Sequence, residues 1–238
     1  MIVLIAAAVL PAAFLLYRVY KMDTIEKEPW SILRKLLLWG ALSGIPAALV
    51  ESLLTGLVGN LLEKGTLLYN FIFGFIVAAL VEESFKFFFL YKFTFKSPHF
   101  NYRFDGVVYA VFVSMGFAIL ENILYVFQGG IGVAITRALL ALPLHAACGV
   151  YMGIAYGQQK VNSLYAPAPF GSVALACLPV PILIHGFYDS CAFSAENYPI
   201  FLVVFVAFVI LVFILTLKRL KKASREDAPV QEVTINAR

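Results

Sequence analysis

Seven long apolar runs divide this chain, and they constrain its fold more than any other feature. The runs cover residues 2–20, 34–58, 68–92, 104–127, 131–157, 171–194 and 198–217. A helix needs about 20 apolar residues to cross roughly 30 Å of hydrocarbon, and these runs are of that length. The mean hydropathy of +0.89 excludes a water-soluble globule of this size. The sequence therefore predicts an all-α, polytopic transmembrane helical bundle with about seven spans, in a range of roughly six to eight.

The positive charges of the loops predict the orientation. Lys and Arg collect in cytoplasmic loops. With the N-terminus outside, fifteen of the 18 Lys and Arg residues fall on the cytoplasmic side, the exceptions being Lys64, Lys86 and Arg137. We therefore expect the N-terminus out and the C-terminus in. Pro179 and Pro181 interrupt the sixth run, which makes it the weakest of the predicted spans.

The loops are too short to hold a soluble domain, so we expect one membrane-embedded domain over residues 1–217. Residues 218–238 begin with a basic cluster suited to anionic lipid head groups and then lose hydrophobic periodicity. We expect this segment to be a flexible cytoplasmic tail. The three cysteines, Cys148, Cys177 and Cys191, lie inside apolar runs without disulfide or metal spacing, which predicts packing roles.

Ionisable side chains inside the apolar runs are the second constraint. They come from the third to the sixth run and are Glu82, Glu83, Lys86, Glu121, His145, His185 and Asp189. A charged residue at the centre of a membrane helix opposes insertion by roughly 2.5–3.5 kcal/mol. We therefore expect these groups to meet one another, or water, at a single site near mid-membrane. Asn122, beside Glu121, would add an amide donor.

Helical spacing gives these side chains directions. Glu82 and Lys86 are four residues apart and share a helix face, whereas Glu83 diverges from Glu82 by roughly 100°. One glutamate is therefore expected to face the site while the other braces it. His185 and Asp189 also lie one turn apart, so the aspartate would accept the imidazole N–H and fix the ring tautomer.

This set of groups predicts water activation by a hydrolase inside the membrane. It offers a carboxylate base, imidazoles that orient water or bind a metal, and donors for an oxyanion. The HExxH motif of most zinc proteases is absent, but His145, His185 and Glu121 would form a His₂Glu zinc site. The sequence leaves two possibilities open: zinc, or no cofactor and a water activated by glutamate alone.

Two other classes of function also fit buried acids and histidines. A proton-coupled transporter or channel is the main alternative, and a membrane receptor without catalysis is the third. Four further ionisable residues have plainer explanations as helix-end, loop or snorkelling side chains and are not placed in the site: Glu51, His99, Asp105 and Arg137.

Four motifs resemble, in the same order, those of the PrsW family of bacterial intramembrane proteases. They are EESFK at 82–86, FAILEN at 117–122, LPLHAACGVYMG at 142–153 and HGFYD at 185–189. The resemblance runs from the first span to the seventh and leaves out the tail. The family is in turn similar to the CAAX-processing and bacteriocin-immunity membrane proteases, in which histidine replaces Glu121 and asparagine often replaces Asp189.

The resemblance implies a multi-pass protease of the bacterial cell membrane, with lipid and a single-pass membrane protein as its partners and no nucleic acid. The substrate would be an anti-sigma factor, cut first by this enzyme in a stress response. The resemblance also implies that Glu82, Glu83 and His185 are essential.

The expected catalytic roles extend over the whole set of buried polar residues. They are a general base (Glu82), its supporting network (Glu83 and Lys86), groups that position the water or a metal (Glu121 and His145), and an oxyanion stabiliser held by an aspartate (His185 and Asp189).

Overall fold

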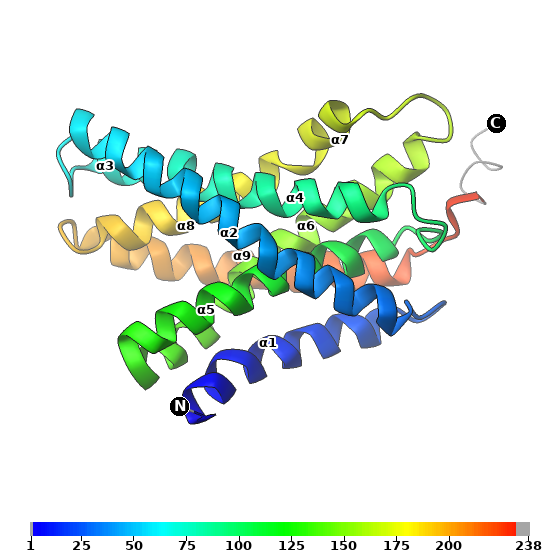
Figure 1. The fold of residues 1–238 in the computed structure, drawn as a ribbon, viewed down its shortest axis with the longest axis horizontal. Coiled ribbons are helices and arrows are strands. Elements are labelled where there is room, and N and C mark those ends of the chain that lie inside the picture. Colours follow the sequence, from blue (N-terminus) through cyan, green and yellow to red (C-terminus); the bar gives the residue numbers. More distant parts are fainter. Residues whose placement is uncertain (1, 232–238) are drawn as a thin grey trace.

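The computed structural model describes residues 2–231, and every regular element within that range is a helix (Figure 1). The helices are α1 (Ile2–Met22), α2 (Trp30–Leu61), α3 (Leu67–Ile72), the π-helix η1 (Phe73–Ala79), α4 (Leu80–Thr94), α5 (Asp105–Leu139), α6 (Ala141–Asn162), α7 (Phe170–Cys177), α8 (Pro179–Ser194) and α9 (Ile200–Arg225). The predicted all-α helical bundle is confirmed.

Several of the predicted spans are built from more than one helix. The third consists of α3, η1 and α4, which follow one another directly, and the sixth consists of α7 and α8, bent by 46° beside Pro179. By length and apolar composition, four of the described helical stretches are able to cross a membrane, or five if α7 and α8 count as one. The number of spans and the orientation remain predictions.

Gly130 reverses the chain inside the bounds of α5. Its φ of 71° is a left-handed conformation that glycine adopts without strain. After the turn, Arg137 returns to contact Glu121, which precedes the turn by nine residues. The reversal lies between the predicted spans 104–127 and 131–157, so α5 holds the end of one and the beginning of the next.

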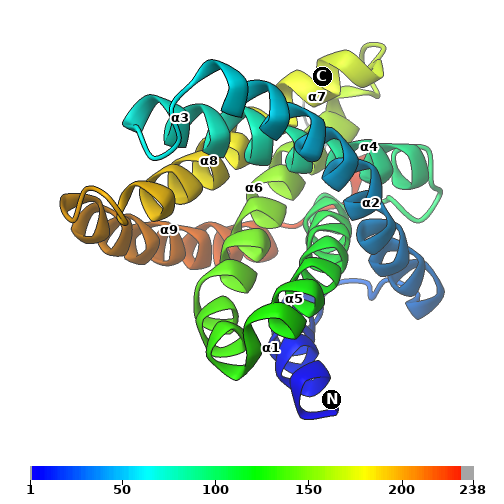
Figure 2. The same cartoon turned by 60° about the vertical axis from the view of Figure 1, so that its left-hand side comes forward.

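Helix α5 is the centre of the bundle, and Figure 2 shows it between α1, α2 and α6. Its antiparallel contact with α6 is close because glycines face backbone: a Cβ at Gly106 would lie 2.7 Å from the carbonyl oxygen of Gly153, and one at Gly149 would lie 2.9 Å from the Cα of Val111. Further along, Ser114 Oγ donates a 2.7 Å hydrogen bond to the carbonyl of His145. This contact fixes the depth of His145 relative to α5.

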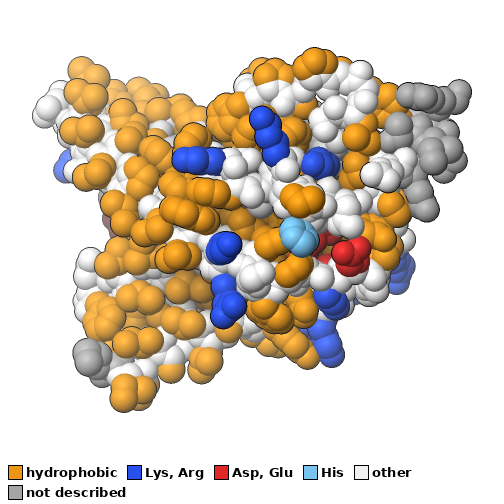
Figure 3. Space-filling model, turned by 45° about the vertical axis from the view of Figure 1, so that its right-hand side comes forward, with side chains coloured by type: hydrophobic (Ala, Val, Ile, Leu, Met, Phe, Trp, Pro, Cys, Tyr) orange, Lys and Arg blue, Asp and Glu red, His pale blue; other side chains and the backbone are white. Residues whose placement is uncertain are grey.

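The C-terminal segment is tied to the loop before α5. The predicted domain boundary after residue 217 lies inside α9, which continues to Arg225. Beyond it, Asp227 Oδ1 accepts a 2.8 Å hydrogen bond from the Phe104 amide, and the Val230 amide donates to Asn101 at 2.8 Å. Figure 3 shows Lys and Arg gathered on the face toward this end of the molecule. Residues 232–238, the rest of the predicted tail, lie outside the described residues.

Buried acids lie at the same end, in the connector between α1 and α2. Asp23 is 1% exposed and Glu28 is 3% exposed. Burial raises the pKa of Asp23 to about 6 and that of Glu28 to about 7. The Tyr109 hydroxyl donates a 2.7 Å hydrogen bond to Glu28, which only partly offsets the effect of burial.

Glu28→Gln should reduce the pH dependence of stability. The folded protein holds a proton on Glu28 up to pH about 7, whereas an unfolded glutamate releases it near its ordinary pKa of 4.5. Stability contributed by this group is therefore lost as the pH rises through that window. We expect the melting temperature of the wild type in detergent to fall between pH 5 and pH 8, and that of Glu28→Gln to fall less. Glu63→Gln, at an exposed acid, is the control; equal pH dependence in all three proteins would contradict the assignment.

Candidate functional site

All the predicted site residues except Asn122 meet in one group of side chains, together with Arg137. We call this group the polar cluster. Its members come from four helices: Glu82, Glu83 and Lys86 from α4, Glu121 and Arg137 from α5, His145 from α6, and His185 and Asp189 from α8. The expected meeting of charged groups from distant parts of the sequence is thus what the structure contains.

The π-helix η1 precedes Glu82 and Glu83 and packs closely on α8. A Cβ at Gly74 would lie 2.9 Å from the carbonyl oxygen of Gly186, and one at Gly186 would lie 2.4 Å from the Phe75 ring. Short π-helical turns are frequent at functional sites because they shift the register of the residues that follow. Here the two glycines allow η1 and α8 to approach, which brings His185 beside α4.

Lys86 is the central member of the polar cluster. Its ammonium group is buried and lies 2.9 Å from Glu82 Oε2, 2.8 Å from Glu83 Oε1 and 3.1 Å from His145 Nδ1. The Phe117 ring lies below it, with 4.1 Å between Nζ and the ring centroid. An ammonium has three donors and no acceptor, so all three are used.

These contacts determine the tautomer of His145. Because the Lys86 ammonium can only donate, His145 Nδ1 must accept and therefore carries no proton. The other nitrogen, Nε2, lies 3.0 Å from Glu121 Oε2 and donates to it. His145 is thus held as the neutral imidazole with its proton on Nε2.

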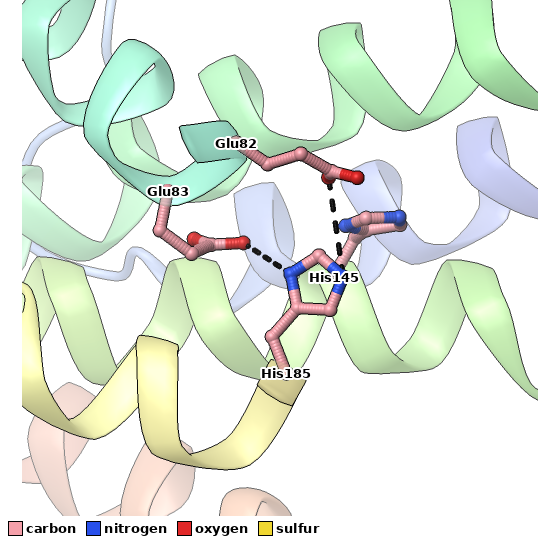
Figure 4. Close-up of side chains that lie close together, drawn as sticks. All are labelled: Glu82, Glu83, His145 and His185. Atoms are coloured by element: carbon pink, nitrogen blue, oxygen red, sulfur yellow. Dashed lines mark hydrogen bonds and ion pairs between the residues drawn. The ribbon is translucent and has the colours of Figure 1, made fainter. Parts of the chain in front are cut away.

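His185 lies among three carboxylates, those of Glu82, Glu83 and Asp189. Figure 4 shows the first two of them beside the ring. Its Nδ1 donates to Glu83 Oε1 at 2.9 Å, whereas its Nε2 is 3.4 Å from Asp189 Oδ2 and 4.0 Å from Glu82 Oε2. The closest partner of the ring is therefore Glu83, whereas the sequence predicts Asp189. The Nε2 edge is the one left facing the more accessible carboxylates.

The expected divergence of the two adjacent glutamates is wrong at the level of their carboxylates. Glu82 and Glu83 leave the helix in different directions, yet both bond to Lys86, one from four and one from three residues away. Positions three and four residues apart are both neighbours on a helix surface, and the glutamate side chain is long enough to reach from either. Glu83 still braces, because the same oxygen also accepts from His185.

Arg137 is the member that sequence reasoning missed, because we assigned it a snorkelling role. Its Nη2 lies 2.8 Å from Glu121 Oε2, its Nε donates to Asn122 Oδ1 at 2.9 Å, and its guanidinium carbon is 4.2 Å from the Tyr125 ring centroid. The signal in the sequence is the glycine pair at 129–130, which permits the turn that returns Arg137 to α5.

Asn122 does not contact the carboxylates or imidazoles of the cluster. Its Nδ2 donates to the carbonyl of Ala8 on α1 at 2.8 Å, and its oxygen accepts from Arg137. Its supporting role is therefore to hold α1 and Arg137 in place. Glu51, which the sequence analysis does not place in the site, has a buried Oε1 without a hydrogen-bond partner. The negative charges of Glu82 and Glu121 lie near enough to repel an ionised Glu51.

Exposure differs sharply across the polar cluster. The side chain of Glu83 is 0% exposed and that of Glu82 is 8% exposed, whereas Asp189 and Glu121 reach 18% and 23%. The cluster is therefore most open on the side of Asp189 and Glu121. Of the two adjacent glutamates, Glu82 is the less buried.

Four of the cluster residues fit a divalent cation. Glu82, Glu83, His145 and His185 each offer one ligand atom, and these atoms lie within 4.8 Å of one another. Imidazole and carboxylate are ligands that zinc accepts. Glu83 Oε2 is buried without a partner, and the four carboxylates of the cluster exceed its two permanent cations by two charges. Glu121, which we expected among the ligands, lies outside this group of four.

Comparison with known proteins gives one consistent result. The sequence model of the PrsW family intramembrane metalloproteases matches residues 28–216. Protease PrsW of Oceanobacillus iheyensis is 33% identical over 226 residues, covering 94% of this chain and 97% of the relative. Protease PrsW of Geobacillus kaustophilus is 34% identical over 205 residues, 85% of each chain, and that of Bacillus subtilis is 31% identical over 210 residues, 88% of this chain and 91% of the relative. No solved structure matches this chain.

A double-mutant cycle should reveal coupling between Arg137 and Glu121. Removing one partner of a buried charge pair leaves the other uncompensated, and we expect Arg137→Gln and Glu121→Gln each to cost about 1–3 kcal/mol of stability. The double variant should cost less than the sum by at least about 0.5 kcal/mol. Reversible unfolding in mixed micelles measures all four proteins. Additive costs would show that the two side chains do not interact.

Proposed function

The chain belongs to the PrsW family of intramembrane metalloproteases and is a multi-pass protein of the bacterial cell membrane. We therefore propose that its polar cluster is the catalytic site for peptide-bond hydrolysis. The single observation that carries this proposal is the position of Glu82. It combines a partly accessible carboxylate with the Lys86 ammonium at 2.9 Å and His185 Nε2 at 4.0 Å. A base and a hydrogen-bond donor this close together can contact a water and the carbonyl that it attacks at the same time.

Glu82 is the general base in this scheme. One of its oxygens is bonded to Lys86, so the carboxylate is oriented, and its side chain is the more accessible of the two adjacent glutamates. It accepts the proton of the attacking water and passes it to the leaving amine. Glu83 is a positioning residue, because its Oε1 is shared by Lys86 and His185 in a fully buried location.

His185 is the oxyanion stabiliser. With Nδ1 held by Glu83, the ring presents Nε2 toward Glu82 and Asp189, where the tetrahedral intermediate would form. Asp189 keeps Nε2 protonated in the resting enzyme through its 3.4 Å contact. In the transition state the substrate oxyanion takes the place of Asp189 and accepts a stronger hydrogen bond from Nε2. Because this bond forms only in the transition state, it lowers the activation barrier for hydrolysis.

A series of side-chain contacts from Arg137 to Lys86 sets the charge of the site. Arg137 neutralises Glu121, Glu121 orients the proton of His145, and His145 accepts from Lys86. Each contact fixes the donor or acceptor role of the next. Lys86 is thereby kept as an ammonium beside Glu82, where it stabilises the ionised form of the base.

A divalent cation, if held, would be bound by Glu82, Glu83, His145 and His185, and each imidazole would then offer the cation an unprotonated nitrogen in place of one of its present hydrogen bonds. Such a cation supplies a Lewis acid that polarises the scissile carbonyl. Lys86 already bonds to three of these four residues, so the ammonium and a cation would compete for the same carboxylate and imidazole atoms. The zinc set that we predicted from sequence is thus replaced by a proposed set that contains both adjacent glutamates.

The substrate is a membrane protein, as expected of an intramembrane protease. We propose more narrowly a single-pass anti-sigma factor, on the strength of the motif resemblance described above. A single transmembrane helix next to the polar cluster would have to unwind locally before hydrolysis, because a helical peptide bond is shielded by its own hydrogen bonds.

Glu82→Gln should abolish proteolysis without unfolding the protein. The amide keeps the shape of the side chain but cannot accept a proton, and loss of a general base lowers rates by about 10²–10⁴-fold. Purified enzyme in proteoliposomes with a labelled single-pass substrate gives the cleavage rate. Glu63→Gln, at an exposed glutamate, should cleave at the wild-type rate. Near-normal cleavage by Glu82→Gln would disprove the assigned role.

Metal removal tests the proposed ligand set. We expect a strong chelator to abolish cleavage and added zinc to restore it. Mass spectrometric metal analysis of Glu83→Gln and His185→Ala should show less bound metal than in the wild type, because each variant lacks one ligand. Full activity after complete metal removal would refute the metal and leave hydrolysis with Glu82 alone.

A further inference from the structure

A groove lies between α1 and α9 with α6 as its floor, on the opposite side of α6 from the polar cluster. We call it the α1–α9 groove. It has a volume of about 360 Å³, and its walls include Phe14 and Arg18 from α1, Pro143 from α6, and Phe213, Thr216 and Lys221 from α9. Apart from these cations and the threonine, its lining is apolar. Nothing in the proposed catalytic scheme uses it.

The charges of the groove are all at one end. Arg18 and Lys221 line it where α1 and α9 approach their C-terminal ends, and no Asp or Glu lines it. Both side chains are exposed, and neither forms an ion pair within the described part of the chain. Two cations above an apolar channel match an amphipathic anion whose charged end is at the membrane surface.

Thr216 adds a second observation inside the groove. It lies five residues, or about 7.5 Å, before Lys221 along α9. Its hydroxyl is buried and has no hydrogen-bond partner, although a threonine in a membrane helix ordinarily bonds to a carbonyl of the preceding turn. A buried hydroxyl without a partner is destabilising, and a hydrogen-bond acceptor on a ligand in the groove would offset that cost.

We propose that the α1–α9 groove binds an anionic phospholipid. The phosphate lies between Arg18 and Lys221, an ester carbonyl accepts from Thr216, and one acyl chain extends along Phe213 toward Pro143. The apolar part from Lys221 to Phe213 is about 12 Å long at 1.5 Å per residue. Pro143 lies two residues before His145, so the bound chain supports α6 directly behind the polar cluster.

Native mass spectrometry of the full-length protein tests this proposal with phosphatidylglycerol and phosphatidylcholine of identical acyl chains. We expect the anionic lipid to be retained at least fivefold better. The double variant Arg18→Gln and Lys221→Gln should lose this preference. The matched control, Lys21→Gln with Lys218→Gln, removes two charges from the same helices outside the groove lining and should keep it.

Thr216→Val tests whether the ester carbonyl of the lipid lies beside Thr216. The valine has nearly the same shape and removes a hydroxyl without a protein partner, so the lipid-free melting temperature should not fall. Retention of the anionic lipid should fall about fivefold, and unchanged retention would overturn this placement. Three results would overturn the proposal. The two lipids could bind equally, the two double variants could lose the same amount of anionic lipid, or a single-pass substrate could displace lipid regardless of its head group.

Discussion

One buried ammonium group, that of Lys86, is the interaction on which the site depends. A lysine without exposure to water is tolerated in a membrane bundle only if its donors are satisfied, and here two carboxylates and one imidazole satisfy all three. Those bonds hold α4 to α6 and keep Glu82 and Glu83 together despite their like charges. The same ammonium requires His145 to accept at Nδ1, so charge balance, helix packing and tautomer have one common origin.

The sequence predicted the helical fold and the meeting of the buried polar side chains, because both follow from the cost of placing polar groups in hydrocarbon. It did not predict contacts that depend on a turn or on side-chain reach. Arg137 enters the cluster only because Gly130 reverses the chain, and Glu83 reaches Lys86 only because its side chain spans the divergence of the helix positions. Asn122 was placed beside the carboxylates, yet it faces α1, since helix rotation cannot be fixed by one motif.

A network of acids and histidines also suits a proton-coupled transporter, and the predicted seven spans also suit a receptor. Membership in a protease family decides between these classes in favour of the enzyme. The physical features support the same choice, because Glu82 and His185 present a carboxylate oxygen and an imidazole nitrogen 4.0 Å apart, beside the more accessible Asp189. Most of the remaining charges serve to hold these two groups. The α1–α9 groove, on the other side of α6, connects this arrangement to the surrounding lipid.

The most direct test of the central claim is the protonation state of His145 in the metal-free protein. The chain contains only three histidines, so ¹⁵N solid-state NMR in bilayers, with a His145→Gln sample for assignment, resolves each ring. We predict a neutral His145 with Nδ1 unprotonated and Nε2 protonated, and we expect this form to disappear in Lys86→Met. A His145 that is protonated on Nδ1, or one that is unaffected by the loss of Lys86, would contradict the account.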